Sequence, residues 1–526
     1  MMGDDRSHPL QAEVHSGQAP FSAARMRSSL HLFAAGKLIS GMIGIAWLLT
    51  LVRALDVSHY SGYVVLMALL EIVLLVSNAG VYPFAHRYIT EGRLPHNLPL
   101  LPGLIWRSLA YRIATLALAA GAVAVLARPL AMLVGQPLLT QVLAMYAFVI
   151  VFEGSTRYLE LAFESLLEQG RAQLCAVLRN GARLVIVALL WSGGDTLNLS
   201  QVVRIEASTA VLGFLLAVVV MAQALRVHRR LVFSSALPAD SFSLQRLMSF
   251  ALPLFIAQCL TQLYSPDTIK LIVSRLLGVT EAAAFGFAHA LSFVIQRYLP
   301  ASLLVGLIRP MLVARRAHGG SDQDLMLVGN LILKINLFVL LPVAAVFAVA
   351  GREFAALASG GKYADAGPLL FLMTLLLVLT GAHVVLSMLA TALEDRRAVL
   401  IGTMVSIPGI VVGTWLAPAL GAMAMVLGLW LSELLWCSFT LWLLRQRGFA
   451  FRIDGAAWAK LVTAASVAAA SAAWLTDLLA LSGVVRLMAA GAVIAVVYLA
   501  ACVALAPLSS YERKMLTRLL PARWQR

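Results

Sequence analysis

The sequence predicts an all-α polytopic membrane protein of about fourteen transmembrane helices, built as two parallel-repeat six-helix lobes plus two C-terminal helices. The first of three observations is composition: 61% of the 526 residues are hydrophobic and only 12% are charged, whereas about 25% of an average soluble domain is charged. The second is that apolar runs of about 18 residues or more, long enough to cross a bilayer as a helix, recur along nearly the whole chain. The third is an internal repeat, which predicts the two lobes.

The apolar runs place the helices. A helix rises about 1.5 Å per residue, so each run covers a hydrocarbon layer of roughly 30 Å. No separate soluble domain is visible between the runs. The predicted helices are residues 30–55, 60–83, 104–126, 138–162, 174–193, 202–225, 249–276, 282–308, 325–350, 367–392, 398–416, 421–443, 457–476 and 485–506.

The basic residues predict how the chain is threaded through the membrane. The formal net charge is +15, and the arginines and lysines gather in segments on the same side as the N-terminus, including the turns at Arg171 and Arg397. The opposite side holds little beyond Arg128, Arg352 and Lys362. This is the asymmetry of the positive-inside rule, so both termini are expected in the cytoplasm. The charge reports orientation, and no nucleic-acid partner is needed to explain it.

The N-terminal segment predicts a cytoplasmic tail. Residues 1–29 are polar, contain Asp4 and Asp5, and precede a full-length apolar run. A secretory signal peptide would have a short apolar core and a small-residue cleavage site, and neither pattern is present.

The cysteines do not indicate a disulfide framework or a metal site. They stand singly in apolar runs, without a CxxC pair or a cluster with histidine, so we expect buried small apolar side chains and no metal. The four residues are Cys175, Cys259, Cys437 and Cys502.

Two polar segments reveal the repeat. LEQGRAQL, beginning at Leu167, returns as LEDRRAVL at Leu393, and LVRALDVS, beginning at Leu51, returns as VSRLLGVT at Val273, with offsets of 226 and 222 residues. Six helices per copy is an even number, so both copies enter the membrane from the same side and the repeat is parallel. A substrate path between the two lobes follows. The predicted divisions are a tail (1–29), a first lobe (30–225), a linker (226–248), a second lobe (249–444), two added helices (445–506) and a basic tail (507–526).

Two stretches carry a family resemblance. RALDVSHYSGY, from Arg53 to Tyr63, and FAHRYITE, from Phe84 to Glu91, resemble the oligosaccharide and O-antigen flippases of the multidrug/oligosaccharidyl-lipid/polysaccharide exporter superfamily. The similarity extends over residues 28–506. It implies an inner-membrane flippase that rocks between inward-facing and outward-facing states and moves undecaprenyl-diphosphate-linked oligosaccharide. A polysaccharide polymerase and a chain-length regulator are the partner proteins that such a pathway would supply.

Charged side chains within the predicted helices mark the expected cavity. A charge at the bilayer centre costs about 2.5–3.5 kcal/mol on insertion scales, so each should face the protein interior or water. The seventh and eighth helices carry polar residues at helical spacing, and the repeat places the first and second helices across the cleft from them. The predicted cavity residues are Lys37, Arg53, Glu71, Asp267, Lys270, His289 and Arg297.

These residues divide by chemistry. We expect Lys37, Arg53, Lys270, His289 and Arg297 to bind substrate, because cations offset the lost hydration of a diphosphate. Glu71 and Asp267 are the expected sites for a coupling proton or sodium ion. No other cofactor is indicated.

Two of these assignments have structural alternatives. Asp267 and Lys270, three residues apart, could neutralise each other as an intrahelical pair. Arg53 and Arg275 could be anchors at the helix ends, with their charged heads reaching the membrane surface.

A second set of charges is expected to be structural. The fourth and fifth helices carry acids and arginines spaced for ion pairs within one lobe, and Arg112 and Lys334 correspond to each other in the repeat. Glu433 in the twelfth helix has no role that the sequence indicates. The first-lobe set is Glu153, Arg157, Glu160, Glu164, Arg179 and Arg183.

Three other functions compete with the flippase. A drug/cation antiporter of the same superfamily would need a cation-binding acid in the first helix, which instead carries Lys37 and Arg53. A flippase for peptidoglycan precursors is harder to separate, since it also has fourteen helices. A membrane glycan polymerase or ligase would need catalytic groups outside the membrane, and no such constellation is visible in the sequence. The sequence therefore favours a transporter over an enzyme.

Overall fold

The computed structural model describes residues 23–91, 98–192, 196–229, 255–256, 258–302, 322–393, 396–509 and 512. Within these ranges the chain is helical, and its extended backbone is limited to an isolated bridge between Leu55 and Leu197. In the described part of the chain, thirteen helices are long and apolar enough to cross a membrane. The predicted fold class, an all-α polytopic membrane protein, is thereby confirmed.

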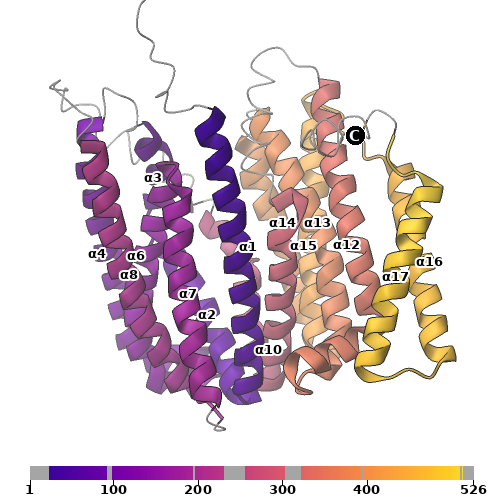
Figure 1. Ribbon diagram of the computed structural model, residues 1–526, viewed down its shortest axis with the longest axis horizontal. Helices are drawn as coiled ribbons and strands as arrows, with labels where there is room; N and C mark the ends of the chain where they lie inside the picture. The colour runs from indigo at the N-terminus through magenta and orange to yellow at the C-terminus, as the bar shows by residue number, and fades with distance from the viewer. Residues whose placement is uncertain are drawn as a thin grey trace, which may run out of the picture.

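The helices stand side by side in two groups with a further pair at one edge (Figure 1). The first lobe contains α1 (Ala23–Ala54), α2 (Val57–Val76), α3 (Val81–Glu91), α4 (Leu101–Val125), α5 (Ala127–Leu133), α6 (Leu139–Ser165), α7 (Gln169–Ser192) and α8 (Leu199–Arg229). The second lobe contains α10 (Pro266–Tyr298), α12 (Asp322–Ser359), α13 (Gly367–Ala392), α14 (Arg396–Leu420) and α15 (Ala422–Gln446). The added pair is α16 (Gly455–Leu478) and α17 (Gly483–Leu505).

The second predicted helix, residues 60–83, is two helices in the structure. α2 ends at Val76, and the chain turns through Ala79 and Gly80, whose φ values are 43° and 83°, before α3 begins at Val81. Buried Arg112 of α4 donates to the Leu74 carbonyl at 2.9 Å and to Ser77 Oγ at 3.2 Å. Its guanidinium thus satisfies polar groups that the end of a helix leaves without partners inside the protein.

Predicted helices seven and eight meet at Gly278. α10 contains a non-helical residue there, with φ 85° and ψ −170°, and the candidate span around it covers 41 residues, Gln258–Tyr298. A straight helix of that length would be about 60 Å long, twice the thickness of the hydrocarbon layer. Lys270 before the break and His289 after it line the same cavity, so the chain folds back at Gly278. Gln258–Tyr298 counts as one span across this break, which is why thirteen spans are observed and fourteen were predicted.

The two lobes are joined at the end of the bundle where α1 passes into α2, the lower end in Figure 1, which we call the closed end. Lys362, between α12 and α13, donates to the carbonyls of Val52, Arg53 and Leu55 at 3.2, 2.7 and 2.7 Å. In return, Arg53 Nε donates to the Ala358 carbonyl at 3.2 Å. Each cation therefore satisfies free carbonyls at the end of a helix in the opposite lobe.

A second interlobe contact packs the closed end. Gln136 Nε2 donates to Ser61 Oγ of the first lobe at 2.8 Å and to Ser274 Oγ of the second at 3.0 Å. Its neighbour Gly135 has φ 70°, and a Cβ there would lie 3.2 Å from the Ser274 carbonyl oxygen. Glycine is required at that position both by the backbone conformation and by the close approach of the lobes.

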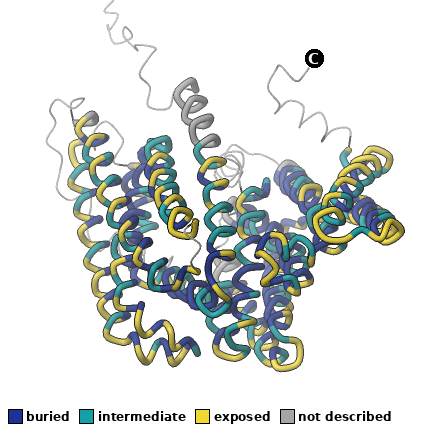
Figure 2. The backbone as a smooth tube through the Cα atoms, turned by 60° about the horizontal axis from the view of Figure 1, so that its bottom comes forward, coloured by how far each residue is buried: buried dark blue, intermediate teal, exposed yellow. Residues whose placement is uncertain are grey.

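The added helices are fixed to the second lobe through one buried lysine. Lys334 of α12 is 2.6 Å from Asp454, which precedes α16, and 2.7 Å from Glu512, which follows α17. The hydrogen bond from Lys334 holds the pKa of Asp454 below its usual range. Both ends of the pair are thereby tied to α12, and Figure 2 shows the pair at the rim of the bundle with exposed outer faces.

We expect Lys362→Met to loosen the closed end, because the variant keeps the length of the side chain but removes three donors to α1. A loss of about 1.4 kcal/mol changes the ratio of two states tenfold. Spin labels at the exposed positions Leu126 and Leu357, one in each lobe, should report a new population at longer distance by electron double resonance. Lys460→Met, at an exposed position of α16, is the matched control. Identical distance distributions in the two variants would show that Lys362 does not hold the lobes together.

Candidate functional site

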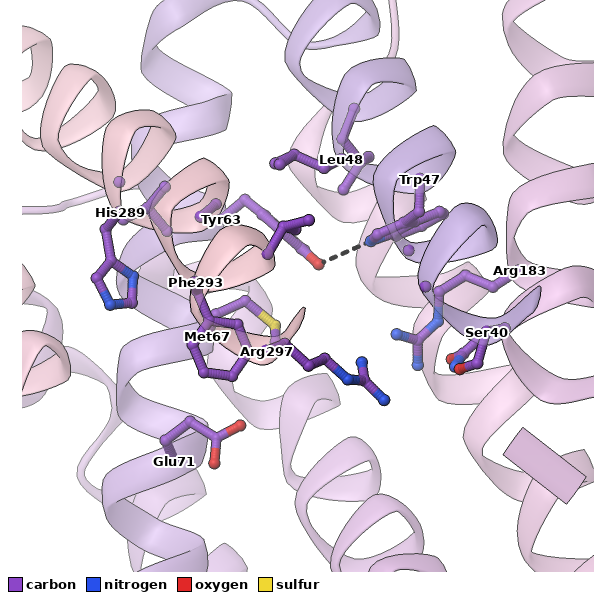
Figure 3. Close-up of a pocket in the computed structure, with 18 of the residues that line it drawn as sticks. Ser40, Trp47, Leu48, Tyr63, Met67, Glu71, Arg183, His289, Phe293 and Arg297 are labelled. Carbon is purple, nitrogen blue, oxygen red and sulfur yellow. Dashed lines mark hydrogen bonds between the residues drawn. The ribbon is translucent and has the colours of Figure 1, made fainter. Parts of the chain in front are cut away.

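A cavity of about 690 Å³ lies between the lobes. α1, α2, α6 and α7 of the first lobe form one wall, and α10 of the second lobe forms the other. Figure 3 shows side chains from both walls projecting into this space. A cavity therefore lies between the two lobes, where the sequence predicted a substrate path.

Five of the seven predicted residues line this cavity: Glu71, Asp267, Lys270, His289 and Arg297. They come from α2 and from both halves of α10, which the break at Gly278 brings together. No three or more His, Cys, Asp or Glu residues are grouped for metal binding in the part of the chain that the structure describes.

The other two predicted residues lie elsewhere. Lys37 is near Arg297 and Glu164 but outside the cavity lining. Arg53 does not face the cavity, contrary to its predicted place across the cleft: its side chain donates to the backbone of α12 at the closed end. The alternative role of an anchor at a helix end is closer to what the structure shows, although the partner is protein and not the membrane surface.

An ion-pair network forms the first-lobe wall. Arg157 Nη1 and Nη2 donate to the two carboxylate oxygens of Glu71 at 2.9 and 2.8 Å, and Arg157 Nε donates to Glu153 at 3.1 Å. Arg179 lies 3.1 Å from Glu153 and 3.2 Å from Glu160. Glu71 on α2 is thus linked through α6 to α7, and these ion pairs within one lobe agree with the structural role expected for the second set of charges.

The network extends to residues that the sequence did not single out. Arg183 lies 3.4 Å from Glu206, a buried acid of α8. Glu206 accepts from Tyr63 at 3.0 Å, and Trp47 Nε1 donates to Tyr63 at 3.3 Å (Figure 3). Glu206 lies in a predicted helix and was detectable as an intramembrane acid, but its partner Arg183 is on another helix and no spacing rule connects them.

The second-lobe wall contains an ion pair within one helix and a cation that has no ion-pair partner among the described residues. Lys270 Nζ donates to Asp267 at 2.8 Å, so these two neutralise each other in the structure, as the alternative reading allowed. His289 stacks on Phe293 at 6.2 Å between ring centroids. Arg297 is exposed to the cavity and has no ion pair within the described residues.

The charge of the cavity is nearly balanced, whereas the predicted set of five basic residues and two acids would make it net cationic. Four of its basic groups are paired with carboxylates, and Glu206 behind the wall adds a further acid. The charge available to a ligand is therefore that of Arg297. The charged lining residues are the acids Glu71, Glu153, Glu160 and Asp267 and the bases Arg157, Arg179, Arg183, Lys270 and Arg297.

Opposite the closed end, the described residues of the two lobes are joined by one hydrogen bond. Tyr298 Oη donates to the Lys37 carbonyl at 3.1 Å. A Cβ at Gly41 would overlap the Tyr298 hydroxyl, so the contact needs glycine at that position. Both residues line the cavity, which is consequently bounded by several hydrogen bonds at one end and by this contact at the other.

Glu433, for which the sequence indicated no role, pairs with a histidine in the second lobe. Its Oε2 lies 2.8 Å from His383 Nδ1, joining α15 to α13. His383 also stacks on Trp436, with centroids 3.6 Å apart and an interplanar angle of 5°. Neither His383 nor Glu433 lines the cavity.

Sequence comparison alone does not place the protein: no protein-family model and no curated protein matches the chain.

Comparison of folds does find matches. The lipid II flippase MurJ, in an inward closed conformation, superposes with a TM-score of 0.67 over 92% of this chain and 99% of its own, at 12% sequence identity. An inward-facing multidrug resistance MATE transporter of the MOP superfamily gives 0.58 over 78% and 95%, at 15% identity. The MATE multidrug transporter DinF-BH, in complex with R6G, gives 0.59 over 84% and 99%, at 15% identity. The chain has the fold shared by these transporters.

We expect Glu153→Gln to lower the thermal stability of the purified protein. Glu153 is 8% exposed and lies within 4 Å of three arginines, and removing one member of a buried ion pair costs about 3–5 kcal/mol. Glu168→Gln is the control, because its pair with Arg171 is longer, at 3.7 Å, and about one third exposed, where such pairs contribute about 0–1 kcal/mol. Intrinsic fluorescence during heating measures both variants. Equal unfolding midpoints would contradict the role of Glu153 as the centre of the network.

Proposed function

We propose that the protein is a flippase that moves undecaprenyl-diphosphate-linked oligosaccharide repeat units from the inner to the outer leaflet of the cytoplasmic membrane by alternating access. The observation that carries the proposal is Arg297, the one cavity cation without an ion pair among the described residues, in a transporter fold. The polar headgroup would occupy the cavity, and the polyprenyl tail would remain in the lipid.

The chemistry of Arg297 supports an anionic headgroup. A guanidinium forms charge-assisted, bidentate hydrogen bonds with phosphate, which offset the hydration that the phosphate loses on leaving water. The neighbouring cations are already held by carboxylates, so a weakly anionic or neutral ligand would gain little from them. A diphosphate is a sufficiently strong acceptor to bind Arg297 and compete for a second cation.

The remaining lining suits sugars. Trp47, Tyr63, Phe293 and Tyr298 present aromatic surface to the cavity, and large rings of this kind can contact the apolar faces of sugars. A volume of about 690 Å³ falls in the range of roughly 300–1,000 Å³ typical of small-molecule sites. It suits a headgroup with a few sugar rings, whereas the tail needs the bilayer.

The two boundaries of the cavity support alternating access. Transport by rocking lobes requires one end to close firmly while the other opens. The hydrogen bonds of Lys362 and Arg53 close one end, and within the described residues the bond from Tyr298 bounds the other. If the positive-inside prediction holds, the closed end is the outer one and the structure opens most readily toward the cytoplasm, where lipid-linked units are made.

Two alternatives within this fold deserve an experimental comparison. A lipid II flippase is favoured by the match to MurJ over nearly the full length of both chains, and its cargo also carries a diphosphate. A multidrug transporter is favoured by the MATE matches, but cationic cargo would face unpaired Arg297 and acids that are already in ion pairs. The resemblance of the Arg53–Tyr63 stretch to O-antigen flippases favours the oligosaccharide.

Proposed pathway and partners follow from this cargo. The glycan would be an O-antigen, exopolysaccharide or capsule unit, and a polymerase and a chain-length regulator would act on it after translocation. The protein itself would perform no chemistry on the cargo, so we propose a transporter and not an enzyme.

We expect Arg297→Ala to reduce flipping of a fluorescent undecaprenyl-diphosphate oligosaccharide in proteoliposomes by more than tenfold, because the diphosphate loses its unpaired cation. Arg297→Lys should retain part of the activity, since charge persists but bidentate geometry does not. Lipid II and a cationic dye, tested in the same vesicles, distinguish the alternative cargoes.

Arg204→Ala is the matched control, because Arg204 is an exposed arginine of α8 outside the cavity lining. It should transport like the unmodified protein. Full activity of Arg297→Ala, at equal insertion, would contradict the assignment of the headgroup site.

A further inference from the structure

Arg157 is held in the geometry that arginine uses for phosphate. It lies in the cavity wall, and its two terminal nitrogens donate in parallel to the two oxygens of Glu71 at 2.9 and 2.8 Å. Guanidinium groups bind carboxylate and phosphate with the same bidentate arrangement. The carboxylate of Glu71 therefore occupies a position on Arg157 that a phosphate could take.

The two carboxylates on Arg157 are not equivalent. The Glu71 side chain is 37% exposed, and Arg157 is its ion-pair partner within the described residues. The Glu153 side chain is 8% exposed and is shared with Arg179 and Arg183. Releasing Glu71 breaks a single ion pair at the cavity surface, whereas releasing Glu153 would disrupt the centre of the network.

We propose that Glu71 is a placeholder for the phosphate of the cargo: it holds Arg157 while the cavity is empty, yields Arg157 to the incoming phosphate, and takes up a proton as it does so. This inference rests on the proposed function, since it assigns Arg157 as a second phosphate ligand beside Arg297. It also selects Glu71, and not Asp267, as the acid that couples transport to protons.

The charge balance of the first-lobe network requires the proton. The network has four acids, Glu71, Glu153, Glu160 and Glu206, and three arginines, so it already carries one surplus negative charge. A phosphate on Arg157 would leave the Glu71 carboxylate unpaired next to a second anion inside the membrane. An unpaired charge in such surroundings is costly, and a carboxylate avoids the cost by binding a proton.

Among the described residues, the groups around Glu71 do not offer a replacement cation. Tyr82 of α3 and Arg112 of α4 lie behind it, and Arg112 already donates to the end of α2. Glu153 of α6 and Glu206 of α8 are acids, and Lys270 of α10 is paired with Asp267.

Two further side chains of α10 in the cavity could affect the measured proton uptake. Arg297 would itself bind the phosphate of the cargo. His289 lines the same cavity, and since histidine exchanges protons near neutral pH in water, the experiment includes a variant of it.

The test measures protons taken up on binding. Full-length protein in nanodiscs is titrated with undecaprenyl diphosphate by calorimetry, at pH 6 to 8 and in buffers of different ionisation enthalpy. The unmodified protein should take up about one proton more than Glu71→Gln, and its affinity should fall about tenfold per pH unit relative to that variant. Glu71→Gln should bind more tightly at the upper end of the pH range, because Arg157 is held there by a neutral side chain.

Control variants identify the group that takes up the proton. His289→Gln should keep the proton uptake of the unmodified protein. Glu164→Gln, an exposed acid on the same helix as Arg157 but outside the cavity lining, should keep it as well. A difference infrared spectrum of the unmodified protein should show a protonated carboxyl band on binding, which keeps the test valid if Glu71→Gln folds poorly.

Each result bears on a separate claim. If the unmodified protein does not bind undecaprenyl diphosphate, the proposed function fails and the placeholder with it. If it binds but Glu71→Gln shows the same proton uptake and pH dependence, the placeholder is wrong while the function stands. Loss of uptake in His289→Gln alone would move the coupling site to His289 and overturn the proposal.

Discussion

The cost of placing charge inside a membrane organises this structure. A charged side chain away from water needs a partner, and in the first lobe Glu153 supplies one to Arg157, Arg179 and Arg183. Those arginines in turn hold Glu71, Glu160 and Glu206. Four helices, α2, α6, α7 and α8, are joined by these pairs, so the wall of the cavity is also the centre of the lobe.

The pairing of these charges determines which ligands the cavity can bind. Ten charged groups lie in or behind its walls, yet within the described residues the pairing leaves Arg297 as the cation open to a ligand. A count of the basic groups alone would have suggested a general anion site. Pairing instead makes the site selective, because a ligand must either use Arg297 or displace a carboxylate from its arginine. The same constraint acts at the lobe boundary, where Lys362 satisfies backbone carbonyls that the end of α1 would otherwise leave unpaired.

Much of the fold was predictable because it depends on long apolar runs and on an internal repeat. The repeat is visible in the sequence as two pairs of similar eight-residue segments. The break at Gly278 was predictable from its place in the repeat, opposite the turn at Asp56, although the helices around it are continuous enough to merge into α10. The break within the second predicted helix was not, since it depends on buried Arg112 from α4.

Five of the seven predicted cavity residues line the cavity, but the sequence did not reveal most of their ion-pair partners. Lys270 and Asp267 are neighbours on one helix, and their spacing allowed the pair to be anticipated. Glu71 and Arg157 lie 86 residues apart, and only the packing of α2 on α6 brings them together. Arg53 was misplaced because the repeat gives its depth in the membrane and not the direction of its side chain, which the carbonyls of α12 determine.

The most direct test of this account is a structure of the protein with an undecaprenyl-diphosphate-linked oligosaccharide bound. We expect the diphosphate to lie within hydrogen-bonding distance of Arg297, with the sugars between the lobes and the tail outside them. A headgroup bound elsewhere, with Arg297 directed away from it, would contradict the central claim that this unpaired cation defines the substrate site.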